Sequence, residues 1–198
     1  MAEWQKRFAN CPPLTISVNV SARQLNDSRL VEDVEFALAE SGLKPESLAL
    51  ELTESAIMGN TEQTLAILRR LKAMNVRLEI DDFGTGYSSL SRLQRLPFDS
   101  LKIDRSFIRE LSAGNGTLEI VKAIMQLAQS LRLEVIAEGV ESEEQLCSLR
   151  KLGCDHIQGF LFSKPLDSDS AEGLYRETFE TGFFSPLSAL VAGGEPGR

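Results

Sequence analysis

The sequence predicts an α/β protein in which parallel strands alternate with helices. Six segments have the composition of strands, and segments with helical periodicity separate them at short intervals. Each predicted strand also carries a polar residue at or near its C-terminal end, with apolar residues beside it. The 198-residue chain shows no internal repeat and no linker, so we expect one domain over residues 1–180 and a flexible tail over residues 181–198.

The first half of the chain contains three of the predicted strands. Residues 1–10 should form the end of a helix that Pro12 and Pro13 terminate. Alternating apolar residues predict strands at residues 14–20, 48–53 and 77–81. Apolar residues at helical spacing predict helices at about residues 28–41 and 61–74.

The second half repeats this alternation of strands and helices. A short helix after residue 81 should end at Pro97. Three more strands are predicted at residues 100–104, 134–138 and 156–160. Helices are predicted at about residues 117–131, 142–152 and 169–180.

The polar residues at the strand ends are expected to share one face of the sheet. In chain order they are Asn19, Glu51, Asp81, Lys102, Glu138 and Gln158. Side chains alternate faces along a strand, so the apolar neighbours should face the outer helices while the polar side chains meet on the other side. In a β/α barrel that other side is the lumen, and the C-terminal ends of the strands carry the active site. Six polar residues there would be costly unless they share a ligand.

Asp81 and Asp82 point to the nature of that ligand. Adjacent carboxylates raise each other's pKa, and a divalent cation would cancel their repulsion. The pair alone is equally compatible with a capped turn that carries solvated acids. Together with Asn19 and Glu51, Asp81 forms an oxygen-ligand set that suits Mg²⁺ or Mn²⁺.

A second ion at Asp82 would complete a two-metal site for hydrolysing a phosphate ester. Lys102 could hold a phosphate group or a water molecule, and Glu138 could accept the proton of that water.

The composition of the chain limits the kinds of molecule it can bind and the compartment in which it is expected. The net charge is −8 and no basic run offsets it, which argues against a nucleic-acid polymer. No apolar run approaches the roughly 20 residues of a membrane helix, and the N-terminus lacks the apolar core of a signal peptide. Three cysteines without metal-ligand spacing indicate reduced thiols. We therefore expect a cytoplasmic protein with no membrane segment in this chain.

Residues 81–90 read Asp-Asp-Phe-Gly-Thr-Gly-Tyr-Ser-Ser-Leu. This segment resembles the signature of the EAL-domain cyclic-di-GMP phosphodiesterases. Over about residues 4–166, further motifs match in order at residues 17–21, 51–54, 101–104, 138–141 and 158–162. The resemblance implies a modified TIM barrel that cuts cyclic-di-GMP to linear pGpG with Mg²⁺ or Mn²⁺ in bacterial second-messenger signalling.

The resemblance also implies roles for individual residues in the metal site. Asn19, Glu51 and Asp81 match metal ligands, and Asp82 matches a ligand of the second metal. Lys102 resembles the family's water-positioning lysine, and Glu138 resembles its general base.

Other matched residues surround this site. Gln158 matches a residue near the metal-bound waters. Glu54 resembles the acid that braces the loop after Asp82, a loop tied to dimerisation, so a homodimer through this loop and the following helix is implied. Two roles stay open. Glu141 either braces the site or stabilises the start of a helix, and Asp104 either pairs with Arg105, caps a helix or lines the site.

One family feature is absent from the sequence. No Glu-Ala-Leu segment occurs, and the region that should hold this metal-ligand glutamate would precede Met1. Six predicted strands are also two fewer than the eight that close a TIM barrel. We therefore expect an N-terminally truncated barrel with two open sheet edges and a metal-dependent phosphodiesterase site impaired by the lost ligand. The alternative is a non-catalytic, cyclic-di-GMP-binding or regulatory module.

Overall fold

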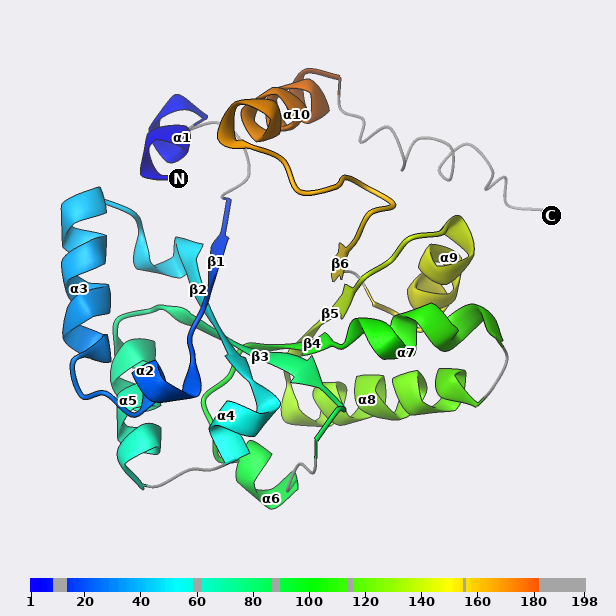
Figure 1. Cartoon of the computed structure of the whole chain (residues 1–198), viewed down its shortest axis with the longest axis horizontal. Helices are drawn as coiled ribbons and strands as arrows, with labels where there is room; N and C mark the ends of the chain where they lie inside the picture. Colours follow the sequence, from blue (N-terminus) through cyan, green and yellow to red (C-terminus); the bar gives the residue numbers. More distant parts are fainter. Residues whose placement is uncertain (9–13, 59–61, 87–89, 114–115, 155, 182–198) are drawn as a thin grey trace.

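The computed structural model describes residues 1–8, 14–58, 62–86, 90–113, 116–154 and 156–181. Within these ranges, six parallel strands form one sheet whose spatial order follows the sequence (Figure 1). The strands are β1 (Ile16–Asn19), β2 (Leu48–Thr53), β3 (Arg77–Phe83), β4 (Ser100–Ile103), β5 (Glu134–Glu138) and β6 (His156–Gln158). The predicted α/β fold with six parallel strands is confirmed. The predicted tail lies outside the described residues from residue 182 onward.

Helices flank the curled sheet. The longer ones, all predicted, are α3 (Leu30–Ser41), α5 (Glu62–Ala73), α8 (Thr117–Leu131), α9 (Glu143–Lys151) and α10 (Ser168–Thr181). The shorter ones are α1 (Ala2–Arg7), α2 (Ala22–Leu25), α4 (Glu54–Met58), α6 (Leu90–Leu93), α7 (Arg105–Arg109) and the 3₁₀ turns η1 (Pro45–Ser47) and η2 (Glu110–Ala113). The sequence analysis missed α2, α4, α7 and both 3₁₀ turns, because so few residues do not show a helical period.

The core lies between the sheet and the outer helices. The strands contribute fully buried Leu52, Leu78, Ile80, Leu101 and Ile103 to one cluster, which also includes Leu68 of α5 and Val121 of α8. Burying each such side chain stabilises the fold by about 1.5–3 kcal/mol. Because side chains alternate along a strand, this packing turns the polar residues of the same strands to the opposite face.

The sheet is open at β1 and β6. In the described part of the chain, β1 pairs only with β2, and β6 pairs only with β5. Val18 of β1 lies on the side of the outer helix α3, as expected, but it is 44% exposed at this edge of the sheet. It borders a groove of about 280 Å³ between β1, β2 and α3, where Val20, Leu30 and Val34 also lie.

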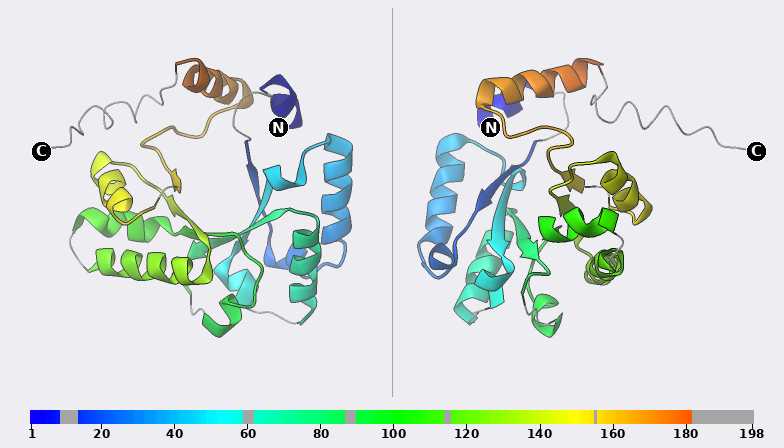
Figure 2. Two further views of the ribbon diagram at one scale, coloured as in Figure 1. Left: turned by 180° about the vertical axis from the view of Figure 1, so that it is seen from behind. Right: turned by 45° about the vertical axis from the view of Figure 1, so that its right-hand side comes forward.

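The first and last helices meet near these open edges. α1 and α10 lie side by side at the end of the sheet where β1 begins (Figures 1 and 2). Arg7 Nη1 is 2.5 Å from Glu172 Oε2, and the rings of Phe8 and Tyr175 pack edge to face with centroids 5.0 Å apart. The sequence analysis did not foresee this contact, which joins segments at opposite ends of the described chain.

None of the helices within the described ranges combines the length and the apolar character that crossing a bilayer requires.

The open edge of β1 predicts that the isolated chain self-associates and binds a hydrophobic dye. Unpaired strand edges with exposed apolar side chains, here Ile16 and Val18, are templates for association. Val18→Lys should reduce both effects in sedimentation and dye-fluorescence measurements. Leu118→Lys on α8, which replaces a similarly exposed apolar residue away from the edge, should not. A monomer that melts cooperatively and binds no dye would show instead that the α1–α10 contact seals the opening.

Candidate active site

A single buried lysine joins acidic residues from three other strands. Lys102 of β4 is only 4% exposed, and its Nζ lies 2.8 Å from Glu51 Oε1 of β2. It also forms an ion pair with Glu138 of β5 and lies 3.8 Å from Asp81 Oδ1 of β3. An ammonium group this deep in the protein is stable only when it is paired. Four of the six predicted strand-end residues therefore meet at one point.

The environment raises the pKa of both Lys102 and Glu138 above their usual values. Burial by itself would lower the pKa of Lys102, but its hydrogen bonds to Glu138 and Glu51 outweigh that effect and hold the pKa above its usual value. Burial raises the pKa of Glu138, and the neighbouring Lys102 charge offsets only part of this rise. Glu138 is therefore a stronger proton acceptor than an exposed glutamate.

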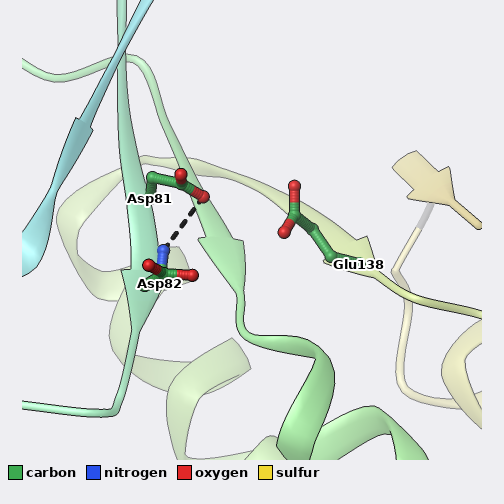
Figure 3. Close-up of side chains that lie close together, drawn as sticks. All are labelled: Asp81, Asp82 and Glu138. Atoms are coloured by element: carbon green, nitrogen blue, oxygen red, sulfur yellow. Dashed lines mark hydrogen bonds between the residues drawn. The ribbon is translucent and has the colours of Figure 1, made fainter. Parts of the chain in front are cut away.

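Asp81, Asp82 and Glu138 form a second grouping beside the lysine. One carboxylate oxygen from each lies within 4.8 Å of the others, and the three side chains point toward a common space (Figure 3). Such a set of oxygen atoms could hold a divalent cation. Burial and the adjacent charge of Asp81 raise the pKa of Asp82.

A backbone irregularity brings Asp82 to this side of the sheet. Consecutive side chains of a regular strand point to opposite faces, so both acids could not face the site in an unbroken strand. β3 continues to Phe83, two residues beyond its predicted end, and its register with β4 shifts between Ile80 and Phe83. Asp82 has a φ of 53°, and the amide N–H of Asp82 donates a hydrogen bond to Asp81 Oδ1 at 3.0 Å. The irregularity re-aims a side chain, as β-bulges do next to active sites.

Asn19 and Gln158 lie on the two edge strands that flank this centre. Asn19 is in register with Glu51, and Gln158 is in register with Glu138. Parallel neighbours in register share a face, so both residues are level with the acids that they adjoin. Both are exposed, because they belong to the open edges of the sheet.

Glu54 lies directly under the loop that follows Asp82. It is 1% exposed at the start of α4, and its Oε2 accepts a hydrogen bond from the amide N–H of Gly84 at 2.9 Å. A Cβ atom on Gly86 would lie only 2.8 Å from Glu54 Oε1, so the loop approaches the carboxylate closely. The Glu54 carboxylate thus contacts the backbone of the loop after Asp82 directly.

The structure decides between the alternatives for Asp104. Its Oδ1 accepts a hydrogen bond from the amide N–H of Ser106 at 2.9 Å, which caps α7. Burial would raise the pKa of Asp104, but hydrogen bonds from Ser106 and Asp82 lower it overall. Asp104 therefore caps a helix and also contacts the acidic group.

Glu141 lies in the loop after β5, outside the grouping around Lys102. Its side chain is 3.9 Å from Arg109 Nη2 of α7 and half exposed, while its amide N–H is bonded to the side chain of Gln145. The sequence analysis missed Gln145 and gave no role to Glu79. Glu79 is a buried residue of β3 in register with Glu51, and burial raises the pKa of its carboxyl group.

Comparison with known proteins identifies the family. The sequence model of the EAL domain matches residues 1–165. This chain belongs to the EAL domain family. The chain is 48% identical over 163 residues to the cyclic di-GMP phosphodiesterase NbdA of Pseudomonas aeruginosa, an alignment that covers 82% of this chain and 21% of that protein. It is 39% identical over 176 residues to the cyclic di-GMP phosphodiesterase PdeR of Escherichia coli, which covers 89% of this chain and 26% of that protein.

Solved EAL structures share the fold. The PaMucR phosphodiesterase in complex with cyclic-di-GMP superposes with a TM-score of 0.82 and 44% identity, over 86% of this chain and 68% of that one. This likeness confirms the TIM-barrel-like fold, here with six of its strands described. The chain spans about a fifth to a quarter of the length of the two curated relatives.

The buried ion pairs predict that Lys102 stabilises the metal-free fold. In a chelating buffer, Lys102→Met should lower the free energy of unfolding by about 3–5 kcal/mol in urea titrations, because it leaves buried carboxylates unpaired. The deficit should shrink as the pH falls from 7.5 to 5, since those carboxylates can then take up protons.

The matched control is Lys122→Met on α8. Lys122 pairs with Glu119 at 2.6 Å, but both side chains are well exposed, so its loss should matter little. Equal destabilisation by the two variants would contradict the structural role of Lys102.

Proposed function

We propose that this EAL domain carries the site of a metal-dependent phosphodiesterase that hydrolyses cyclic-di-GMP to linear pGpG. The observation that carries the proposal is the buried Lys102 held between Glu51 and Glu138, beside the grouping of Asp81, Asp82 and Glu138 at the C-terminal ends of the strands. Relatives named for this activity, at 48% and 39% identity, support the same substrate.

Mg²⁺ or Mn²⁺ is the proposed cofactor. Asn19, Glu51 and Asp81 would hold one ion, and Asp82 would hold a second with an oxygen of Glu138 in reach. The donor set consists of carboxylate and amide oxygens, which fit hard divalent cations. When bound, such ions supply Lewis-acid stabilisation of the phosphodiester oxygens. BlrP1 of Klebsiella pneumoniae, solved with manganese and cyclic-di-GMP, is similar in structure to this chain. The TM-score is 0.72 and the identity 30%, over 83% of this chain and 44% of that one.

The protein's own side chains would handle the proton. Glu138 would accept the proton of the attacking water, and its raised pKa makes it a stronger proton acceptor than an exposed glutamate. Lys102, kept charged by Glu51 and Glu138, would orient that water and stabilise negative charge next to it. Gln158, level with Glu138 on β6, would contact the water from the other side.

Glu54 and Glu141 would act on loops rather than on the reacting atoms. Glu54 would brace the loop after Asp82 through the amide N–H of Gly84. Glu141 would brace the loop after β5 through Arg109. A homodimer through the loop and helix after Asp82 stays a prediction, as does a cytoplasmic location, and the chain's charge of −8 continues to disfavour a nucleic-acid polymer as partner.

The open edge beside Asn19 favours an impaired site in these 198 residues taken alone. Asn19 lies on β1, which in the described residues pairs only with β2, so no neighbouring strand supplies a ligand on its other side. The metal shell would therefore be incomplete there. The alternative function, a non-catalytic module that binds cyclic-di-GMP or regulates a partner, is favoured by this same feature.

Metal binding should depend on Asp81 far more than on Glu79. Both residues face the same side of β3, but Asp81 belongs to the grouping of oxygens at the strand end and Glu79 lies one layer deeper. Loss of residues that merely support metal ligands costs about 10–100-fold in affinity, so Asp81→Asn should weaken Mn²⁺ binding at least as much in calorimetric titrations. Glu79→Gln should change the affinity little. Equal losses of Mn²⁺ affinity in the two variants would place the metal nearer to Glu79, further from the C-terminal ends of the strands than proposed.

The 198-residue chain alone should show little or no hydrolysis of cyclic-di-GMP. Each 1.4 kcal/mol of lost transition-state stabilisation costs about tenfold in rate, and a lost ligand removes several kcal/mol, on the order of a thousandfold or more. Joining a family-like N-terminal segment with its Glu-Ala-Leu strand should restore activity, and Lys102→Ala in that protein should abolish it.

Turnover by the unextended chain at about one per second or faster would refute the impaired site. Another residue must then complete the metal shell, and Glu54 is the first to test by substitution.

A further inference from the structure

The loop that follows Glu138 packs closely against the helix that follows Lys102. Gly139 has a φ of 72°, and a Cβ atom there would lie 2.7 Å from the Cβ of Arg105 in α7. On the other side, the amide N–H of Val140 donates a hydrogen bond to the carbonyl of Gln158 at 3.1 Å. The end of β5 is therefore held between α7 and β6.

Gln145 is the side chain that connects this loop to α7. It lies in the first turn of α9 and is only 7% exposed. Its Oε1 accepts hydrogen bonds from the amide N–H groups of Glu141, at 2.8 Å, and Ser142, at 3.1 Å. Its Nε2 donates to the carbonyl of Ile108 in α7 at 3.2 Å, a buried bond between residues 37 positions apart.

These bonds close a ring of short connections around the Lys102–Glu138 ion pair. α7 begins three residues after Lys102, with Asp104 as its cap, so only a short segment separates Ile108 from the end of β4. Glu141 lies three residues after Glu138, directly after the end of β5. The amide of Gln145 joins Ile108 to Glu141 and thereby links the two strand ends a second time, outside the site.

We propose that Gln145 is a positioning residue that fixes the Glu138 carboxylate relative to the Lys102 ammonium. The geometry of the bridge stands by itself; its importance for hydrolysis rests on the proposed function, in which this pair activates the water. A displacement of about 1 Å in such a pair is enough to impair catalysis. Residues that orient metal-site side chains from behind typically contribute 10–100-fold to affinity or activity.

A purely local role for Gln145 must be separated from this one. Gln145 also completes a capping box with Ser142, whose Oγ accepts a hydrogen bond from the amide N–H of Gln145 at 3.3 Å. Ser142→Ala removes this cap but leaves the amide of Gln145 in place. It is therefore the matched control, because it destabilises the start of α9 without breaking the bridge to Ile108.

The test observes Lys102 in the metal-free protein. In ¹⁵N-lysine-labelled protein, the Nζ resonance of Lys102 reports its burial and its pairing with Glu138. Gln145→Leu should shift this resonance and speed its hydrogen exchange about tenfold, whereas Ser142→Ala should keep the exchange rate within twofold of the wild type. An unchanged signal in Gln145→Leu, or an equal change in Ser142→Ala, would overturn the proposal.

Gln145→Glu covers the case in which the leucine variant fails to fold. A glutamate at this position keeps the acceptor for the loop and suits a capping box, but it cannot donate to Ile108. Its Lys102 exchange rate should exceed that of Ser142→Ala by more than twofold, and a rate equal to that control would count against positioning.

Mn²⁺ titration of the same variants separates this proposal from the proposed function. Gln145→Leu or Gln145→Glu should weaken Mn²⁺ binding about tenfold, and Ser142→Ala should leave it within twofold. A wild-type chain that binds no Mn²⁺ would refute the proposed metal site, while the Lys102 resonance would still decide the role of Gln145. Normal Mn²⁺ affinity in both Gln145 variants would overturn the positioning role.

Discussion

The rest of the site depends on one buried positive charge. Lys102 enters the lumen from β4 and is surrounded by carboxylates from β2, β3 and β5. Without it, the acids that the alternation of the strands brings together would repel one another in a medium where charge is poorly solvated. Because Lys102 offsets this repulsion, the same strands can pack apolar side chains on the outer face and acidic side chains on the inner face. The lysine thus neutralises part of the negative charge that the strands bring together at this point.

Most of the fold could be predicted because two sequence periods determine it: the two-residue alternation of strands and the 3.6-residue repeat of helices. Apolar residues such as Leu78 and Ile80 mark the strands, and the residues at the strand ends follow from the same alternation. The turning of Asp82 could not be predicted, since it depends on a positive φ and on a loop held by Glu54 from another strand's end. The Ser-x-x-Gln pattern at residues 142–145 signals a helix cap, but nothing local reveals its bond to Ile108.

Two of the predicted site residues, Asn19 and Gln158, lie on the edge strands of the sheet. Asn19 and Gln158 are level with the central acids, yet both lie on strands that pair on one side only in the described ranges. EAL relatives match this chain over most of its length and extend well beyond it. In the described ranges, β2 to β5 therefore have a paired strand on both sides, whereas β1 and β6, which carry Asn19 and Gln158, have one on a single side.

The sign of the charge around Lys102 has a consequence for the order in which ligands enter. Glu51, Asp81, Asp82 and Glu138 together carry more negative charge than one ammonium group can cancel. A phosphodiester approaching this surface meets a potential of its own sign. Small cations meet the opposite sign and are concentrated there. For the proposed function this implies an order of binding: the cations would enter first, and only then would the strand-end surface attract an anionic nucleotide.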